Sequence, residues 1–177
     1  MKRALFLDRD GVINKDYNYV YKKEDIVFID GIFDLVREAN QKNYYVLVVT
    51  NQAGIARGFY KEDDFLELSN WMKKQFLLNN SRIDHFYYSP YHPIYGIGKY
   101  KIDSELRKPK PGMFFNAKKD FQLDIKNSIM IGDNETDLVA ANSAGVGKII
   151  CLGTLFKNKF GINIRTLAEA KKFLIKY

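Results

Sequence analysis

The sequence predicts a three-layer α/β fold, in which helices cover both faces of a parallel β-sheet. Short apolar runs that end abruptly at polar residues alternate along the chain with segments of helical periodicity. Buried strands of parallel sheets are continuous apolar runs of this kind, and a strand–helix–strand order places neighbouring strands parallel. The expected arrangement is Rossmann-like, with ligands bound beyond the carboxyl ends of the strands.

The apolar runs place the strands. They are expected at residues 4–7, 44–49, 83–88, 127–131 and 148–152, and a further short apolar run stands at 26–29. The run at 44–49 has the strongest strand signal, because it is rich in valine and tyrosine and stops at a polar triplet.

Each expected helix has a sequence signal at its start. Asp30 can cap a helix whose apolar positions follow the i, i+3, i+4, i+7 spacing. Three acidic residues at 62–64 favour the positive end of the next helix, and Pro111 stands near the start of a third. A fourth helix is expected at 138–144, and a capping box that begins at Thr166 opens a terminal helix.

Residues 89–107 contain prolines, glycines and tyrosines without periodicity, which predicts a long loop. No linker, internal repeat or low-complexity segment divides the chain. We therefore expect residues 1–177 to form one domain, with loop 89–107 over the active site. The segments between the polar strand ends are too short for a large cap domain.

Composition favours a globular protein of a reducing compartment. No apolar stretch approaches the roughly 20 residues of a membrane span. Asp8 stops the first apolar run far short of the roughly 7–15 residues of a signal-peptide core. A single cysteine, Cys151, excludes an internal disulfide, so the cytoplasm is the default. The net charge of +7 suits an anionic substrate or nucleic acid, but the lysines are dispersed and are interpreted mostly as a solvated surface.

The polar residues at the strand ends have the chemistry of phosphoryl transfer. Asp8 and Asp10 follow the first strand and can face one small volume, where they repel each other unless a cation such as Mg²⁺ neutralises them. Thr50 and Asp133 end two other strands, and Lys108 stands just before a helix. Taken singly, each is more often an incidental surface residue. Together they supply a nucleophile, a proton carrier, two charge stabilisers and a metal ligand, so an enzyme is favoured over a binding protein.

This set resembles the haloacid dehalogenase superfamily of Mg²⁺-dependent phosphotransferases. The matching motifs are Asp8-Arg9-Asp10-Gly11-Val12, Thr50-Asn51, Lys108, and Gly132-Asp133 with Asp137. Within the superfamily, residues 28–31, 49–58, 71–72 and 107–113 look like the heptose 1,7-bisphosphate 7-phosphatases. The histidinol-phosphatase domain is a near relative with much of the same pattern.

The resemblance implies a two-step hydrolysis. Asp8 would attack phosphorus and form an aspartyl-phosphate, while Asp10 would protonate the leaving sugar oxygen and later accept a proton from water. Mg²⁺ would bind Asp8, the backbone carbonyl of Asp10, and Asp133, with Asp137 behind them. Thr50 and Lys108 would hold the phosphoryl oxygens. The implied substrate contacts are Asp16, Tyr17, Asn18, Tyr19, Thr50, Asn51, Gln52, Ala53, Arg107, Lys108 and Asn134.

One departure from the family concerns its zinc loop. The bisphosphatases usually carry Cys-x-His and Cys-x-Cys ligands, where this chain has Ser89-Pro90-Tyr91 and Ser104-Glu105-Leu106. Structural zinc needs four nitrogen or sulfur ligands, so we expect none here. The loop tyrosines Tyr91, Tyr95 and Tyr100 either replace the metal by packing or leave the loop mobile.

The expected function is therefore a Mg²⁺-dependent phosphatase of D-glycero-D-manno-heptose 1,7-bisphosphate, acting at the 7-phosphate in nucleotide-activated heptose and lipopolysaccharide biosynthesis. We expect a cytoplasmic monomer whose partner is a small phosphorylated sugar, without nucleic acid or membrane. Histidinol-phosphate phosphatase and polynucleotide 3′-phosphatase use the same chemistry and stay open. The latter should show clustered Arg and Lys with aromatic residues along a groove.

Overall fold

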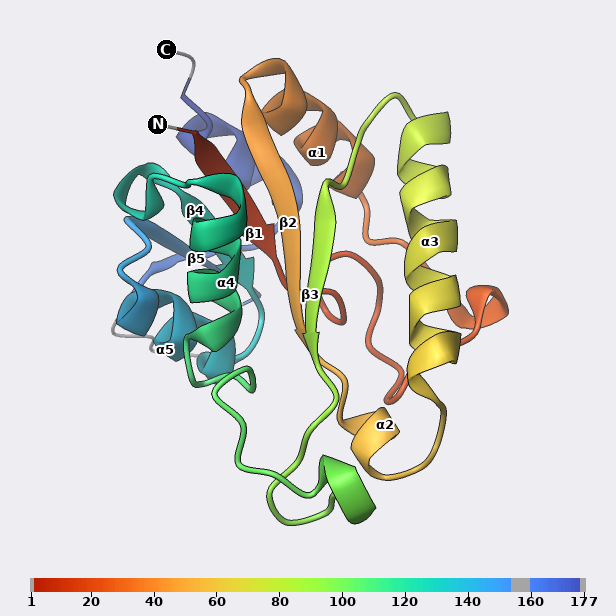
Figure 1. Ribbon diagram of the computed structural model, residues 1–177. Coiled ribbons are helices and arrows are strands. Elements are labelled where there is room, and N and C mark those ends of the chain that lie inside the picture. Colours follow the sequence, from red (N-terminus) through yellow and green to blue (C-terminus); the bar gives the residue numbers. More distant parts are fainter. Residues whose placement is uncertain (1, 154–159, 176–177) are drawn as a thin grey trace.

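The computed structural model describes residues 2–153 and 160–175 and has the predicted three-layer α/β architecture without a large cap (Figure 1). One sheet holds six strands, all parallel, in the order β3-β2-β1-β4-β5-β6. The strands are β1 (Arg3–Leu7), β2 (Tyr44–Asn51), β3 (His85–Ser89), β4 (Ile129–Gly132), β5 (Lys148–Leu152) and β6 (Ile162–Ile164). The α-helices are α1 (Ile32–Gln41), α2 (Ala53–Ala56), α3 (Glu62–Leu78), α4 (Gly112–Phe121) and α5 (Glu135–Ala144). Short 3₁₀ helices are η1 (Lys23–Asp25), η2 (Gly98–Tyr100), η3 (Ile125–Asn127) and η4 (Leu167–Phe173).

The central strand β1 is buried on both faces, which explains its unbroken apolar sequence. Leu5 and Leu7 belong to the core formed with α1 and α3, whereas Ala4 and Phe6 belong to the core formed with α4 and α5. Figure 1 shows α3 and α4 on opposite sides of the sheet. Two hydrophobic cores thus hold β1 between them and fix the position where it ends.

The strand order places the site. From β1 the chain adds β2 and β3 on one side, and it then returns to add β4, β5 and β6 on the other. The carboxyl ends of β1 and β4 therefore lie next to each other at the point where the sheet changes its direction of growth. Ligands of open α/β sheets bind at this kind of switch point.

The segment before α1 differs from the prediction. The expected cap at Asp30 is wrong, and the apolar run at 26–29 before it makes a single antiparallel bridge, between Asn14 and Phe28. Gly31 precedes the helix with a left-handed φ of 80°, and no side chain caps this end. Asp30 is exposed, so the turn depends on the backbone freedom of glycine.

Other differences are smaller. The loop after β2 contains the short helix α2, and the terminal element η4 is a 3₁₀ helix, although its Thr166–Glu169 capping box forms as expected. Strand β6 was missed, because two of its three residues are exposed and give no apolar run. These elements lie at the edges of the fold.

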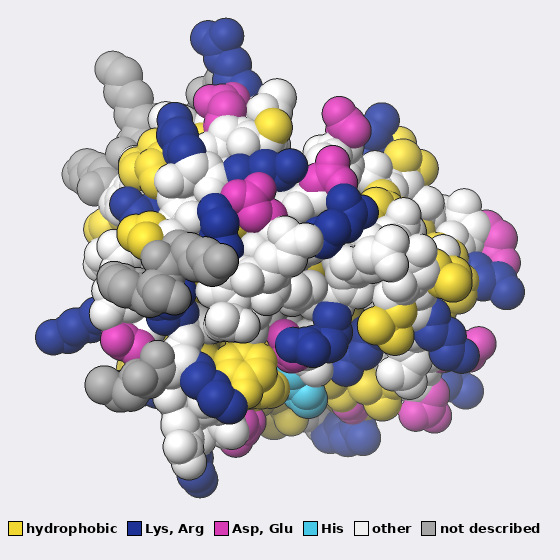
Figure 2. Space-filling model, turned by 90° about the horizontal axis from the view of Figure 1, so that it is seen from above, with side chains coloured by type: hydrophobic (Ala, Val, Ile, Leu, Met, Phe, Trp, Pro, Cys, Tyr) yellow, Lys and Arg dark blue, Asp and Glu magenta, His cyan; other side chains and the backbone are white. Residues whose placement is uncertain are grey.

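The described part of the chain, residues 2–153 and 160–175, contains no helix long and apolar enough to cross a membrane. Figure 2 views the face at the amino ends of the strands, opposite the site. On this face Lys and Arg side chains are scattered among acidic, apolar and other polar groups. That distribution agrees with a solvated surface.

Candidate active site

The carboxyl ends of β1, β2 and β4 open onto a cavity of about 450 Å³. Every residue that the sequence placed in the site lines this cavity, except Tyr17, which is exposed. Two further residues, Tyr60 and Thr136, also line it, and the sequence had not singled them out. The predicted constellation therefore comes together in one place.

Asp8 is fixed at the centre of the cavity floor. Its backbone N–H donates to the carbonyl of Ile131 at 3.1 Å and so continues the pairing of β1 with β4. Its Oδ1 accepts the backbone N–H of Arg9 at 2.7 Å and lies 2.9 Å from Nζ of Lys108. Asp8 is 9% exposed, so its carboxylate sits in a largely dehydrated position with one defined orientation.

Lys108 is 2% exposed, and its ammonium group lies between two carboxylates. Nζ is 2.7 Å from Oδ1 of Asp137 and 2.9 Å from Asp8, and it donates to the carbonyl of Val49 at 2.7 Å. Burial opposes the charge of Lys108, but Asp137 and Asp8 outweigh it and raise its pKa above the ordinary value. The lysine is therefore a permanent positive charge beside Asp8.

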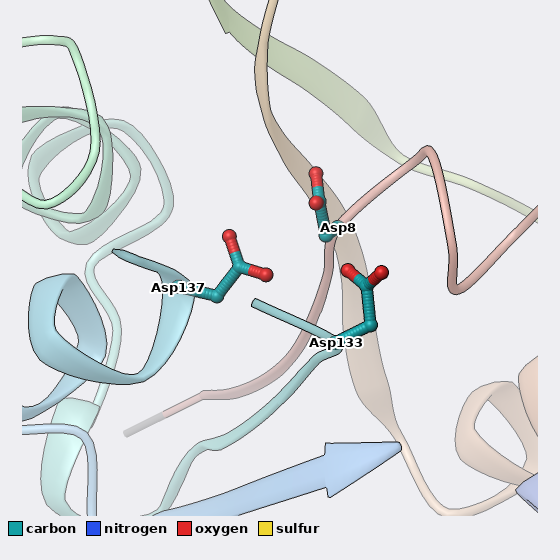
Figure 3. Close-up of side chains that lie close together, drawn as sticks. All are labelled: Asp8, Asp133 and Asp137. Atoms are coloured by element: carbon teal, nitrogen blue, oxygen red, sulfur yellow. The ribbon is translucent and has the colours of Figure 1, made fainter. Parts of the chain in front are cut away.

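Three carboxylates converge beside this lysine (Figure 3). Oxygen atoms of Asp8, Asp133 and Asp137 all lie within 4.8 Å of one another. Burial, and next the charge of Asp137, raise the pKa of Asp8 well above its usual range, and the same two causes raise the pKa of Asp133 to about 7. One lysine cannot neutralise three carboxylates, so the cluster has a deficit of positive charge. A hard divalent cation such as Mg²⁺ prefers oxygen ligands and would supply the missing positive charge.

Gly11 shapes the wall next to this cluster. Its φ is +85°, and a Cβ at this position would lie 2.0 Å from Oδ2 of Asp133. Its N–H donates to the carbonyl of Asn14 at 2.7 Å and closes the turn after β1. Glycine is required here for both the conformation and the close approach.

Asp10 points to a different set of partners. Arg9 donates to its carboxylate from Nε at 3.1 Å and from Nη2 at 2.8 Å, and the side-chain amides of Asn14 and Gln52 donate at 3.0 and 3.2 Å. Arg9 is fully buried and also donates to the carbonyl of Val20 at 2.5 Å. Three donors thus hold Asp10 at the cavity wall, and the arginine between the two aspartates is part of the site.

Gln52 links Thr50, Asp10 and Tyr60. Its Nε2 donates to Oγ1 of Thr50 at 2.8 Å, and its Oε1 accepts the hydroxyl of Tyr60 at 2.5 Å. Burial raises the pKa of Tyr60, which keeps its hydroxyl protonated as a donor. The ring occupies the space beside Gly54, where a Cβ would lie 2.1 Å from it. Nothing in a single sequence distinguishes Tyr60 from the other tyrosines.

Several predicted substrate contacts have local partners as well. Asn51 accepts the backbone N–H of Lys108 and donates to its carbonyl, both at 3.0 Å, so it positions the lysine. Asn134 caps α5, and its N–H donates to Asp137 at 3.1 Å. Asp16 accepts the N–H of Asn18 at 2.8 Å. These bonds order the cavity lining before any ligand is present.

Arg107 lines the cavity, and a second guanidinium group, that of Arg57, lies near it outside the lining. Arg107 donates to the carbonyl of Tyr91 at 3.1 Å, and burial together with the nearby charge of Arg57 lowers its pKa. Arg57 lies over the ring of Tyr95, 4.0 Å from its centroid, and 5.8 Å from that of Tyr19. Within residues 2–153 and 160–175, neither arginine forms an ion pair with an acid. Unneutralised paired guanidinium groups suit an anionic ligand.

Known proteins that are similar to this chain support the same phosphoryl-transfer chemistry. A HAD-hydrolase-like family model matches residues 105–155. D-glycero-alpha-D-manno-heptose-1,7-bisphosphate 7-phosphatase of Burkholderia mallei is 53% identical over 150 residues, which is 85% of this chain and 79% of the relative. The chain belongs to this family of haloacid dehalogenase-like phosphatases. The beta-anomer enzyme of Vibrio cholerae is 46% identical over 86% of this chain and 82% of its own length.

The fold of the heptose bisphosphate phosphatase family is also recognisable in a solved structure. D,D-heptose 1,7-bisphosphate phosphatase of B. bronchiseptica, complexed with magnesium and phosphate, superposes with a TM-score of 0.83. The match covers 98% of each chain at 24% identity, so it supports the architecture.

Proposed function

We propose that the chain removes the 7-phosphate of D-glycero-D-manno-heptose 1,7-bisphosphate in a Mg²⁺-dependent reaction. The observation that carries this proposal is the buried Asp8–Lys108–Asp137 arrangement with Asp133 beside it, opening onto a cavity that also presents Arg107. The relatives from Burkholderia mallei and Vibrio cholerae act, by their names, on this bisphosphate.

In the first step, the carboxylate of Asp8 attacks phosphorus, and the bond from phosphorus to the sugar oxygen breaks. Asp10 gives its proton to that oxygen as the sugar leaves. In the second step, water attacks the aspartyl-phosphate, Asp10 takes a proton from it, and the bond to Asp8 breaks to release phosphate. Lys108 and Thr50, which both line the cavity, would hold the phosphoryl oxygens throughout.

Mg²⁺, when bound by Asp8, Asp133 and the carbonyl of Asp10, would offset the negative charge of the phosphoryl group. Asp137 already pairs with Lys108 and accepts a backbone N–H at the start of α5. We therefore assign it to holding the lysine rather than the metal. Arg9, Asn14 and Gln52 orient Asp10 for proton transfer.

The substrate proposal is tested by phosphate release across a panel. The panel contains both anomers of heptose 1,7-bisphosphate, histidinol phosphate and a 3′-phosphorylated oligonucleotide. Relatives of both anomeric specificities match the chain, so both anomers belong in the panel. The highest kcat/KM is expected for a heptose bisphosphate. A higher value for either of the other two substrates would overturn the proposal.

We expect Arg107, with Arg57 near it, to bind the substrate's second phosphate. Arg107→Ala should lower kcat/KM for heptose 1,7-bisphosphate by the roughly 1.5–3 kcal/mol of a charge-assisted contact, which is a loss of about 10- to 150-fold. The same variant should barely change kcat/KM for p-nitrophenyl phosphate, which has no second anionic group. Equal losses on both substrates would show that Arg107 serves the catalytic centre or the fold.

The metal content is a separate prediction. The purified protein should need Mg²⁺ for activity and contain no stoichiometric zinc, because the loop at 89–107 has no cysteine. Nδ1 of its single histidine, His92, already accepts two backbone N–H groups, from Ile94 and Tyr95. Elemental analysis that finds about one zinc per chain, with folding lost to a chelator, would contradict this prediction.

The remaining parts of the proposal follow from the same function. We propose a one-domain, monomeric, cytoplasmic enzyme that acts on a small phosphorylated sugar without nucleic acid or membrane. Its product would enter the synthesis of nucleotide-activated heptose for surface polysaccharides.

A further inference from the structure

Loop 89–107 is compactly folded, although it contains little regular structure. Its N–H groups at His92 and Gly96 donate to the carbonyls of Tyr100 and His92, both at 3.1 Å. Gly96 is buried, and a Cβ there would lie 2.5 Å from the carbonyl oxygens of both His92 and Tyr100. Figure 1 shows this loop, in green, at the carboxyl end of the sheet. The loop thus has a defined shape that needs an attachment to the rest of the molecule.

Glu62, the first residue of α3, provides that attachment. Its Oε1 accepts the hydroxyl of Tyr100 at 2.6 Å, and its Oε2 accepts the hydroxyl of Tyr88 at 2.7 Å. One carboxylate therefore joins a helix, the end of β3 and the middle of the loop. The hydrogen bond from Tyr100 is the main reason that the pKa of Glu62 lies below its usual value, so the acceptor is ionised and both bonds are charge-assisted.

Glu62 is not needed to begin its own helix. At this end of α3, Oδ2 of Asp64 accepts the backbone N–H of Lys61 at 2.7 Å, so another acid of the first turn closes the start of the helix. The positive end of the helix dipole stabilises the negative charge of Glu62, as it would that of any acid at this position. Its two tyrosine bonds are additional, and they span 26 and 38 residues of sequence.

The anchored loop contacts both Arg57 and Arg107. The N–H of Ile97 donates to the carbonyl of Ala56 at 2.9 Å, directly before Arg57, and the ring of Tyr95 covers the Arg57 guanidinium. At the other end of the loop, Arg107 donates to the carbonyl of Tyr91. A displacement of the loop would therefore move the supports of both guanidinium groups.

We propose that Glu62 is a positioning residue: through Tyr88 and Tyr100 it fixes loop 89–107. The loop in turn sets Arg107 of the cavity lining, with Arg57 beside it, to bind the substrate's non-reacting anionic group. Glu62 acts on binding and leaves the chemical step at Asp8 unaffected. The substrate part of this inference rests on the proposed function, whereas the anchoring of the loop does not.

The anchoring is tested by limited trypsin digestion after Lys99 and Lys101, which are exposed in the loop. The rate at which trypsin cleaves the folded protein depends on the fraction of molecules in which the loop is open. Tyr100→Phe and Glu62→Gln should each accelerate this cleavage by about tenfold or more, since each removes a charge-assisted bond. One variant removes the donor and the other changes the acceptor of the same hydrogen bond, so cleavage should be faster in both.

Tyr87→Phe is the matched control. Tyr87 precedes Tyr88 on β3, and its hydroxyl donates to Asp120 of α4 at 2.8 Å, on the opposite face of the sheet. The Tyr87→Phe variant loses a comparable hydrogen bond to a carboxylate, but that bond does not involve loop 89–107. The loop of this variant should therefore be cleaved at the wild-type rate. Unchanged cleavage in Tyr100→Phe and Glu62→Gln, or equal acceleration in Tyr87→Phe, would overturn the proposal.

The positioning role is tested by kinetics on the same variants. Tyr100→Phe should raise KM for heptose 1,7-bisphosphate by about tenfold, while kcat for p-nitrophenyl phosphate stays at the wild-type value. Faster loop cleavage without a rise in KM, or a fall in kcat on both substrates, would contradict that role. Absence of bisphosphate turnover in the wild-type protein would contradict the proposed function instead, and the cleavage rates would still decide whether Glu62 anchors the loop.

Discussion

Asp8→Asn is expected to abolish phosphatase turnover while the protein stays folded. The amide lacks the charge that attacks phosphorus, and it removes a metal ligand at the same time. It keeps the shape of the side chain and an oxygen that can accept the N–H of Arg9. It also removes a charge that is disfavoured by burial and by repulsion from Asp137 and Asp133, the causes that raise the pKa of Asp8. In metal-free buffer the variant should therefore unfold at a temperature no lower than the wild type does.

Phosphate release and thermal unfolding of the purified variant check this expectation. Asp34→Asn is a suitable control, because Asp34 is an exposed acid on α1 that pairs with Arg37 far from the cavity. It should keep wild-type activity. Appreciable turnover by folded Asp8→Asn protein would remove Asp8 from the nucleophile role.

Asp10→Asn should lower kcat/KM by the roughly 10²- to 10⁴-fold that general acid–base help contributes. The parameter reports the step in which the sugar leaves, because the aspartyl-phosphate forms irreversibly once the alcohol departs. A sugar alkoxide is a poor leaving group and needs the proton that Asp10 supplies. The p-nitrophenolate ion leaves without one, so the loss should be much smaller on p-nitrophenyl phosphate.

The comparison of the two substrates separates proton transfer from a structural effect. The side-chain oxygen of asparagine can still accept the hydrogen bonds that Arg9 and Asn14 donate to Oδ1 of Asp10, and the bond from Gln52 to Oδ2 is lost. The cavity wall should therefore be kept. An equal loss on heptose bisphosphate and p-nitrophenyl phosphate would show that Asp10 acts by another route than protonation of the leaving group.

The sequence alone predicted the parts of the site that depend on strand ends. Asp8, Thr50 and Asp133 follow apolar runs that pair in parallel, and parallel strands bring their carboxyl ends to one edge. The wrong predictions concern segments decided by local backbone geometry. Asp30 had the composition of a cap, but the chain turns at Gly31 with a positive φ and no side chain caps the helix.

The contacts that the sequence did not reveal join residues far apart along the chain. Gln52 meets Asp10 across 42 residues, and Tyr100 meets Glu62 across 38. Side chains such as Arg9 and Tyr60 have no local signal, because their role depends on which tertiary neighbours they meet. A single sequence carries the residue types but not those pairings.

The most direct test of the proposed function is to follow the hydrolysis of heptose 1,7-bisphosphate by phosphorus-31 NMR. With Mg²⁺ present, the signal of the 7-phosphate should disappear as inorganic phosphate forms, while the signal of the 1-phosphate remains. Release of the 1-phosphate, or no release from either anomer by folded, Mg²⁺-supplied protein, would contradict it.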